Sequence, residues 1–424
     1  MNETAGKGQG GIVLLYHRPL GRGAATVLEH VDAFPKFSRS RVWTVNTELG
    51  FPSVLPQLPC DVLVFHYSLF GIWPYTIGRE FERYIAGVRA HKIAFFQDEH
   101  RYCGPRFEFL NTHGVDTVYS LLDPADADAV YRPRTTVSDV QYALPGYVSD
   151  DLVAVARTMT VPEEQRTIDI GYRGRRLAYY MGRGAQEKHE IGRGVAERTA
   201  AAGLRVDIDT EESSRLYGDS WYRFMANCRA VLGVEAGVSI FDIDDVVRPA
   251  CEKWLADHPA ATFEETSAAV LAPFEDNIRY RTISPRHFEA AAFRVCQILF
   301  DGEYSGALRP MVHYIPLRKD FSNWQEVMAS FSDAALRRQL TERSYDDLIA
   351  SDRFSYRTFL RGFDDHLAGK NIVPSRRVED DDSIQRQLNR GSWIGRGRAA
   401  AMWALRQPFP GRARAVNFVR RLRR

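Results

Sequence analysis

Hydrophobic and polar positions in the first third of the chain follow a pattern typical of a parallel sheet covered by helices. Short apolar runs are separated by stretches in which apolar residues recur with helical spacing. The apolar runs are GIVLLYH (11–17), RVWTV (41–45), DVLVFHY (61–67), KIAFFQDEH (92–100) and DTVYSLL (116–122), and an amphipathic helix is predicted over 79–91. The pattern predicts an α/β, Rossmann-like domain.

A second alternation of the same kind begins at residue 167. Its predicted strands are TIDIGYRG (167–174), RVDID (205–209), AVLGVE (230–235), VCQILF (295–300) and HYIPL (313–317), with helices between them and three more between about 323 and 369. Residues 145–166 contain no clear strand. We therefore predict an N-terminal domain at 1–150, a linker at 151–166, a C-terminal domain at 167–369 and a tail at 370–424.

The length and composition agree with two soluble domains. A chain of 424 residues exceeds one ordinary core, and 45% hydrophobic with 26% charged residues is usual for globular proteins. No apolar run approaches the roughly 20 residues of a membrane span, and the polar start lacks a leader-like apolar stretch. Five scattered cysteines without a CxxC pair favour a reducing compartment, so we expect a cytoplasmic protein.

Charge is concentrated at the end of the chain. Residues 383–424 hold eleven arginines and no Asp, Glu or Lys, so a net charge of +2 for the whole chain leaves the rest at about −9. Apolar residues lie among these arginines, and RAAAMWALR (398–406) has amphipathic helical character. We expect the tail to bind an anionic membrane surface. The alternative is a disordered cationic tail, and nothing in the body of the chain indicates specific nucleic-acid recognition.

Polar residues at predicted strand ends are the first candidates for chemistry. Ligands of parallel sheets bind outside the carboxyl ends of the strands, where His66 and the group Asp98, Glu99 and His100 fall. A carboxylate or imidazole there can deprotonate an acceptor hydroxyl. Each of them can also be an ordinary hydrogen-bonded residue at a strand end.

The stretch IGYRGRRLAYYMGRGAQEKHEIG (170–192) combines a strand end, glycines and basic residues. Gly171 and Gly174 allow backbone amides to approach an anion, and a following helix start adds partial positive charge. Arg175 and Lys188 would neutralise a diphosphate. The alternative is a loop of solvated basic residues, since neither a Walker A motif nor a dinucleotide fingerprint is present.

A third candidate is the helix start in ISPRHFEAAAF (283–293). Ser284 suits the cap, Pro285 suits the first turn, and Glu289 interrupts an otherwise apolar beginning. A carboxylate there can compensate the helix dipole, or it can accept hydrogen bonds from the hydroxyls of a ligand.

These segments resemble a known family. ISPRHFEAAAF, followed by ILFDGEYSGAL and HYIPLRKDFSNWQEV, resembles the C-terminal half of group 1 nucleotide-sugar glycosyltransferases, which have the GT-B architecture of two facing Rossmann-like domains. DVLVFHYS, KIAFFQDEHR and IDIGYRGR with its downstream QEK are similar to bacterial members linked to surface polysaccharide synthesis. The resemblance covers roughly residues 10 to 368.

The resemblance implies a role for each candidate. Glu289 would bind the ribose hydroxyls of the donor, with Ser284 and Arg286 beside it, and Arg175 and Lys188 would clamp the diphosphate. The remaining candidates are Asp98 or Glu99 as general base, His66 or His100 near the donor sugar, and Ser239 and Arg281 as contacts to sugar or acceptor. Positive side chains replace a metal in this layout, so no metal and no cofactor are expected.

The chain also departs from the family pattern. Arg281 stands where many relatives carry a second glutamate, and Arg294 and Cys296 replace a usual glycine and proline. Arg281 would then meet a diphosphate or an acidic sugar, or lie in solvent. The acidic runs DIDD (242–245) and EDDD (379–382) are interpreted as solvated turns and not as metal ligands.

Together these observations predict a metal-independent glycosyltransferase that moves a sugar from a nucleotide-diphosphate donor to a hydroxyl of a glycan or lipid-linked acceptor. It would be cytoplasmic and peripheral on the membrane, and would serve cell-surface polysaccharide or glycolipid synthesis. Two alternatives remain: a sugar-nucleotide epimerase, and a non-catalytic protein that binds nucleotide or carbohydrate in an assembly.

Overall fold

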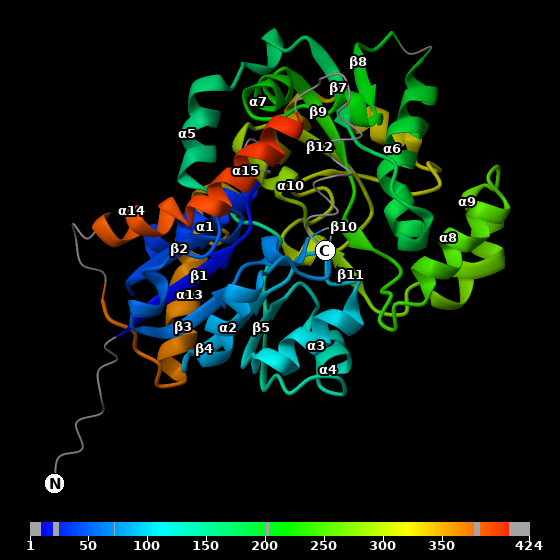
Figure 1. The fold of residues 1–424 in the computed structure, drawn as a ribbon. Helices are drawn as coiled ribbons and strands as arrows, with labels where there is room; N and C mark the ends of the chain where they lie inside the picture. The colour runs from blue at the N-terminus through cyan, green and yellow to red at the C-terminus, as the bar shows by residue number, and fades with distance from the viewer. Residues whose placement is uncertain (1–9, 20–24, 72, 201–202, 377–381, 407–424) are drawn as a thin grey trace.

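The structure is a computed structural model that describes residues 10–19, 25–71, 73–200, 203–376 and 382–406. It contains two parallel sheets, each in its own α/β domain, with the N-terminal domain drawn in blue and cyan and the C-terminal domain in green and yellow (Figure 1). The predicted fold class, two Rossmann-like domains that face each other, is confirmed.

The N-terminal sheet has six parallel strands in the order β2-β1-β3-β4-β5-β6. Its strands are β1 (Gly11–Tyr16), β2 (Val42–Asn46), β3 (Cys60–Phe65), β4 (His91–Phe95), β5 (Thr117–Ser120) and β6 (Asp139–Tyr142). Its helices are α1 (Ala25–Phe37), α2 (Arg79–Gly87), α3 (Cys103–His113) and α4 (Pro124–Tyr131). Helices cover both faces, so β1 buries Ile12 in one core cluster and Val13 in another. This explains why the strands are apolar without alternation.

The C-terminal sheet has five parallel strands in the order β13-β12-β9-β7-β8. Its strands are β7 (Ile168–Arg173), β8 (Val206–Asp209), β9 (Cys228–Gly233), β12 (Cys296–Phe300) and β13 (Ile315–Leu317). Its helices are α6 (Arg183–Thr199), α7 (Asp219–Ala226), α10 (Pro285–Ala292), α11 (Trp324–Ser332) and α12 (Ala334–Tyr345), while α5 (Asp150–Met159) leads into it. All five predicted strands are present.

A short hairpin and an insert extend this domain. β10 (Ala236–Val238) and β11 (Tyr280–Thr282) pair antiparallel, and between them lie residues 239–279, here called the insert. The insert contains α8 (Val247–Asp257) and α9 (Phe263–Thr266), which stand apart at the right of Figure 1. The sequence pattern predicted its helices but not the hairpin.

The chain returns to the N-terminal domain before it ends. α13 (Tyr356–Gly369) buries Leu360 and Phe363 in the same core cluster as Ile12 and Phe34. The predicted C-terminal domain, 167–369, therefore gives its last helix to the other domain. A helical pattern shows which face is buried, but not against which partner.

Two further helices, α14 (Asp382–Arg390) and α15 (Trp393–Arg406), lie over the N-terminal domain (Figure 1). The Gln385 side chain accepts a hydrogen bond from Thr44 N and donates one to Thr44 O, at 3.0 and 2.8 Å, so α14 covers the edge strand β2. Among the described helices, none has both the length and the apolar character needed to cross a bilayer.

Candidate functional site

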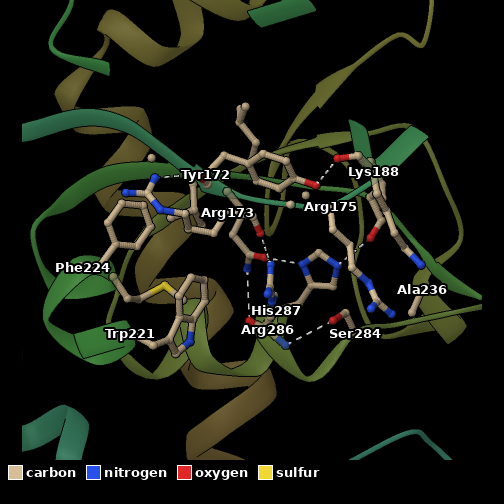
Figure 2. Close-up of a pocket in the computed structure, with 18 of the residues that line it drawn as sticks. Tyr172, Arg173, Arg175, Lys188, Trp221, Phe224, Ala236, Ser284, Arg286 and His287 are labelled. Carbon is tan, nitrogen blue, oxygen red and sulfur yellow. Dashed lines mark hydrogen bonds between the residues drawn. The ribbon is translucent and has the colours of Figure 1, made fainter. Parts of the chain in front are cut away.

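A cavity of about 270 Å³ opens at the carboxyl ends of β7 and β9, and is called here the C-domain cavity. Figure 2 shows the rings of Trp221 and Phe224 toward one end of it and Lys188 toward the other. The backbone at Gly174 approaches that of Lys188 closely, and a Cβ at position 174 would lie only 2.7 Å from Lys188 O, so a glycine is needed there. The cavity therefore has an aromatic end suited to a flat ring and a cationic end.

Five basic residues line this cavity, and its lining holds no carboxylate; they are Arg173, Arg175, Lys188, Arg215 and Arg286. Arg173 is paired with Asp207 at 2.8 Å, and Arg215 with Glu212 at 2.6 Å. The other three form no ion pair with any residue that the structure describes. A cavity lined in this way suits an anion with several charges.

Lys188 is half-buried at the cationic end of the cavity. Its Nζ donates to Gly237 O at 3.3 Å. Burial first, and then the charge of Arg175, lower the pKa of Lys188 to about 8. A phosphate next to Lys188 would restore its ordinary pKa, so its proton and an anionic ligand should bind cooperatively.

The anion site expected at the start of the helix that carries Lys188 is already filled. α6 begins at Arg183, whose amide donates to Glu275 Oε1 at 2.8 Å. The next amide, of Gly184, donates to Ser239 Oγ at 2.9 Å. Both acceptors come from the insert, so the first two amides of this helix are paired within the protein. Ser239, 1% exposed, caps a helix and does not line either cavity described here.

The start of α10 does face the C-domain cavity. Ser284, its cap, and Arg286 both line it. The Arg286 guanidinium lies 4.8 Å from the ring centre of Trp221 and donates to Arg173 O. Ser284 and Arg286 therefore both face this cavity, and their contact with a donor stays a prediction.

Glu289 lies one turn further along α10, behind Trp221. Its Oε2 accepts a hydrogen bond from Trp221 Nε1 at 2.8 Å, and Oε1 has no hydrogen-bond partner among the described residues. Burial raises the pKa of Glu289, while the Trp221 indole and the charge of Arg286 act against it. Glu289 thus contacts the wall of the cavity through Trp221, and its role toward ribose stays a prediction.

A second cavity, of about 200 Å³, lies between the domains and is called here the interdomain cavity. Gln97, Asp98 and His100 reach it from the N-terminal domain, and Tyr280 and Thr282 reach it from the C-terminal domain. It shares Arg175, Lys188 and Ala236 with the C-domain cavity. The two cavities therefore meet at the same pair of cations.

Asp98 and His100 are the titratable groups of the N-terminal domain at this junction. Desolvation alone would raise the pKa of Asp98, but the basic groups around it, His100 and Arg101 first among them, hold it below its ordinary value. Burial lowers the pKa of His100 to about 3, against the charge of Asp98. Both are therefore deprotonated at neutral pH, the state that a general base requires. Neither ring nitrogen of His100 has a hydrogen-bond partner within the described structure.

Two of the other predicted residues lie away from both cavities. Glu99, 4% exposed, accepts hydrogen bonds from Leu121 N at 2.9 Å, Ser120 Oγ at 2.8 Å and the Tyr131 hydroxyl. His66, fully buried, has its Nε2 3.0 Å from His30 Nδ1. Both are satisfied inside the N-terminal domain, which corrects their predicted contact with substrate.

Arg281 has a structural partner in place of a ligand. Its Nη1 lies 3.0 Å from Oε2 of Glu187, which is 4% exposed and also pairs with Lys319 at 2.8 Å. At position 281 this chain thus has an arginine neutralised by a neighbouring glutamate. Arg281 lines neither of the two cavities, and its side chain is only 13% exposed, so it does not lie free in solvent.

Several lining residues were not predicted from the sequence, among them Arg173, Arg215, Trp221, Phe224 and His287. Trp221 and Phe224 belong to α7, which the sequence pattern predicted only as a helix between two strands. His287 follows Arg286 directly, but His287 Nδ1 lies 2.8 Å from Gln297 Oε1, a pairing across 10 residues of chain. Among the residues that the structure describes, no three His, Cys, Asp or Glu side chains gather as a metal site would require.

Comparison with known proteins gives similarity of structure only. No protein-family model matches the chain, and no curated protein matches it. Solved structures similar to it include HepE of Anabaena in complex with UDP (10% identity, 85% of this chain, 100% of that chain, TM-score 0.46). An alpha-glucosyltransferase in complex with UDP-glucose and DNA is similar at 12% identity (84% and 99%, TM-score 0.48). TarM is similar at 9% identity (71%, TM-score 0.40), and the chain spans about half of its length, 53%.

Proposed function

We propose that this protein is a glycosyltransferase that moves a sugar from a nucleoside diphosphate to a hydroxyl group. The observation that carries the proposal is the junction of the two cavities at Arg175 and Lys188. A nucleoside fits the C-domain cavity with its aromatic end, and its diphosphate reaches the two cations. The attached sugar then enters the interdomain cavity, beside Asp98 and His100.

The reaction follows from this placement. The acceptor hydroxyl loses its proton to Asp98 or His100, and its oxygen forms a bond to the anomeric carbon. The bond from that carbon to the diphosphate oxygen breaks, and the nucleoside diphosphate leaves with the electron pair. Arg175 and Lys188 stabilise the charge that develops on the leaving group. The transition state has oxocarbenium character, as in glycoside hydrolysis.

Glu289 lines neither cavity, so as the proposed acceptor for the ribose hydroxyls it requires the Trp221 side chain to move aside when the donor binds. Its Oε1 has no hydrogen-bond partner in the described structure, and Oε2 can share its lone pairs between the Trp221 indole and a hydroxyl. We expect Glu289→Ala to weaken donor binding roughly 10- to 150-fold, since a hydrogen bond to a charged group contributes about 1.5–3 kcal/mol. Glu326→Ala, at an exposed position on α11, is the control.

Thermal shift with UDP-, GDP-, TDP- and CMP-sugars tests the proposal, followed by product analysis with the sugar that stabilises most. A protein that binds one of them should be stabilised by mass action and should release the free nucleotide when an acceptor is added. Absence of any shift would contradict the proposed donor site. Binding without product would favour a non-catalytic carbohydrate-binding role.

A membrane surface is the proposed setting of the acceptor. On α15, Trp393 and Ile394 are 77% and 63% exposed, beside the exposed Arg396 and Arg398. Exposed apolar side chains among arginines suit an anionic membrane interface. The other apolar residues suggested for this contact, from Met402 onward, lie outside the residues whose side chains are described. Sedimentation with anionic and zwitterionic vesicles tests the contact: we expect binding to the anionic vesicles only, weakened in Trp393→Ala.

A further inference from the structure

The acidic run DIDD (242–245) at the start of the insert joins the two domains. Asp242 caps α8, since its carboxylate accepts from Val247 N at 2.9 Å and from Arg248 N at 3.0 Å. Its own amide donates to His100 O at 3.0 Å, across the domain boundary. The run is therefore not the solvated turn that the sequence suggested.

Asp245 makes the closer contact. Its Oδ1 accepts from Cys103 N at 3.0 Å and its Oδ2 from Gly104 N at 2.8 Å, so it caps α3 of the other domain. α3 has no side-chain cap of its own and no acidic residue in its first turn. Two amides at a helix start are thus satisfied by a carboxylate from the C-terminal domain.

The residue before α3 is fixed by the same insert. Tyr102 has a φ of 55°, in the left-handed region, which costs energy for a residue with a side chain. Its hydroxyl accepts from Arg248 Nη1 at 2.6 Å. Asp245 also has a positive φ, 56°. Strained backbone on both sides of the contact indicates that the surrounding interactions hold it in place.

The contact lies beside the proposed chemistry. The loop from Gln97 to Tyr102 carries Asp98 and His100 and runs directly into the first turn of α3. Its other end is held by the Tyr280 hydroxyl, which donates to Gln97 O. The loop is therefore tied to the C-terminal domain at both ends, while the ring nitrogens of His100 have no hydrogen-bond partner among the described residues.

We propose that Asp245 is a positioning residue that holds the loop of Asp98 and His100 against the C-terminal domain by capping α3 from across the cleft. The proposal rests on the transferase function for its catalytic consequence, but the cap itself does not depend on it. Donor binding should not need Asp245, because the C-domain cavity is lined by the C-terminal domain alone.

The test compares Asp245→Asn with Asp244→Asn, an exposed neighbour that removes the same charge. Asparagine offers one acceptor where two amides need one each, so hydrogen exchange in peptides covering 98–107 should become at least fivefold faster in Asp245→Asn only. Affinity for UDP should stay within twofold. With donor saturating, kcat/KM for the acceptor should fall about tenfold, with most of the loss in kcat.

If Asp245→Asn proves insoluble, Arg248→Met takes its place as a second variant on the same contact. It should speed hydrogen exchange in the same peptides. Unchanged exchange at 98–107 in the soluble variant would overturn the proposal, and so would a loss of UDP affinity equal to the loss of turnover. If the wild type transfers no sugar at all, the proposed function fails, while the exchange experiment still decides whether Asp245 caps α3.

Discussion

The charge state of Lys188 gives the sharpest prediction about the donor site. Its pKa of about 8 means that roughly 90% of the free protein carries the Lys188 charge at pH 7 and roughly 10% at pH 9. A diphosphate binds the charged form preferentially. The affinity for UDP should therefore fall about tenfold from pH 7 to pH 9.

Two substitutions separate this effect from general effects of pH. Lys188→Met should weaken UDP binding at pH 7 roughly 10- to 150-fold, the equivalent of a lost charged hydrogen bond of about 1.5–3 kcal/mol, and should abolish the pH dependence. Lys188→Arg keeps its charge throughout this range, so its affinity should not change with pH. Lys253→Met, on the surface of α8 with 80% of its side chain exposed, is the control.

Isothermal titration calorimetry at pH 7, 8 and 9 measures these affinities directly. If UDP gives no heat, GDP and TDP are titrated next, since the charge of Lys188 acts on the diphosphate and does not determine which base binds. If the affinity of Lys188→Met for UDP at pH 7 stays within twofold of the wild-type affinity, the proposed role of Lys188 is refuted. A tenfold loss at pH 9 that persists in Lys188→Met would assign the titration to another group.

Three further predictions concern stability and metals. Burial first, then the charges of Glu289 and Asp151, raise the pKa of Glu29 to about 7, so the folded state favours its protonated form; that contribution is complete below pH 4.5 and is lost as pH rises to 7. Between these pH values the wild type should lose about 3 kcal/mol of unfolding free energy, which Glu29→Gln should retain. Urea titrations of both proteins at pH 5 and pH 8 measure this. An equal change in unfolding free energy for the two proteins would contradict the burial of this carboxyl. Gly171→Ala places a Cβ 2.3 Å from Cys228 Sγ and should cost about 1–3 kcal/mol in thermal unfolding, whereas Gly362→Ala, with open space around it, should not destabilise. Transfer should continue after dialysis against EDTA, and a loss that magnesium restores would show that a metal is needed.

The sheets were predictable because their strands are buried on both faces. Runs such as Ile12 to Leu15 leave no alternative to a central strand, and the order of strands and helices then indicates two α/β domains. The position of α13 was not predictable in this way. Its apolar face, with Leu360 and Phe363, would fit either domain, and only the three-dimensional structure shows that it packs against α1.

The site was predictable where a residue follows a strand end directly. Asp98 and His100 lie at the interdomain cavity as the rule for parallel sheets suggested, but the chain turns at Glu99, whose carboxylate is held inside the domain by Ser120, Leu121 and Tyr131. Arg281 shows the complementary limit. Its partner Glu187 is 94 positions away in the chain, so spacing alone could not reveal that its charge is neutralised.

The return of α13 to the first domain has a consequence for how the protein is made. Strands β1 to β6 leave the ribosome early, but the face of their sheet that α13 packs on is covered only in part, by α1, until residues 356–369 have been synthesised. The N-terminal half therefore cannot reach its native core while translation of the second half continues. Part of this apolar face is exposed to solvent during that interval, and partly folded chains with exposed apolar surface are prone to aggregation.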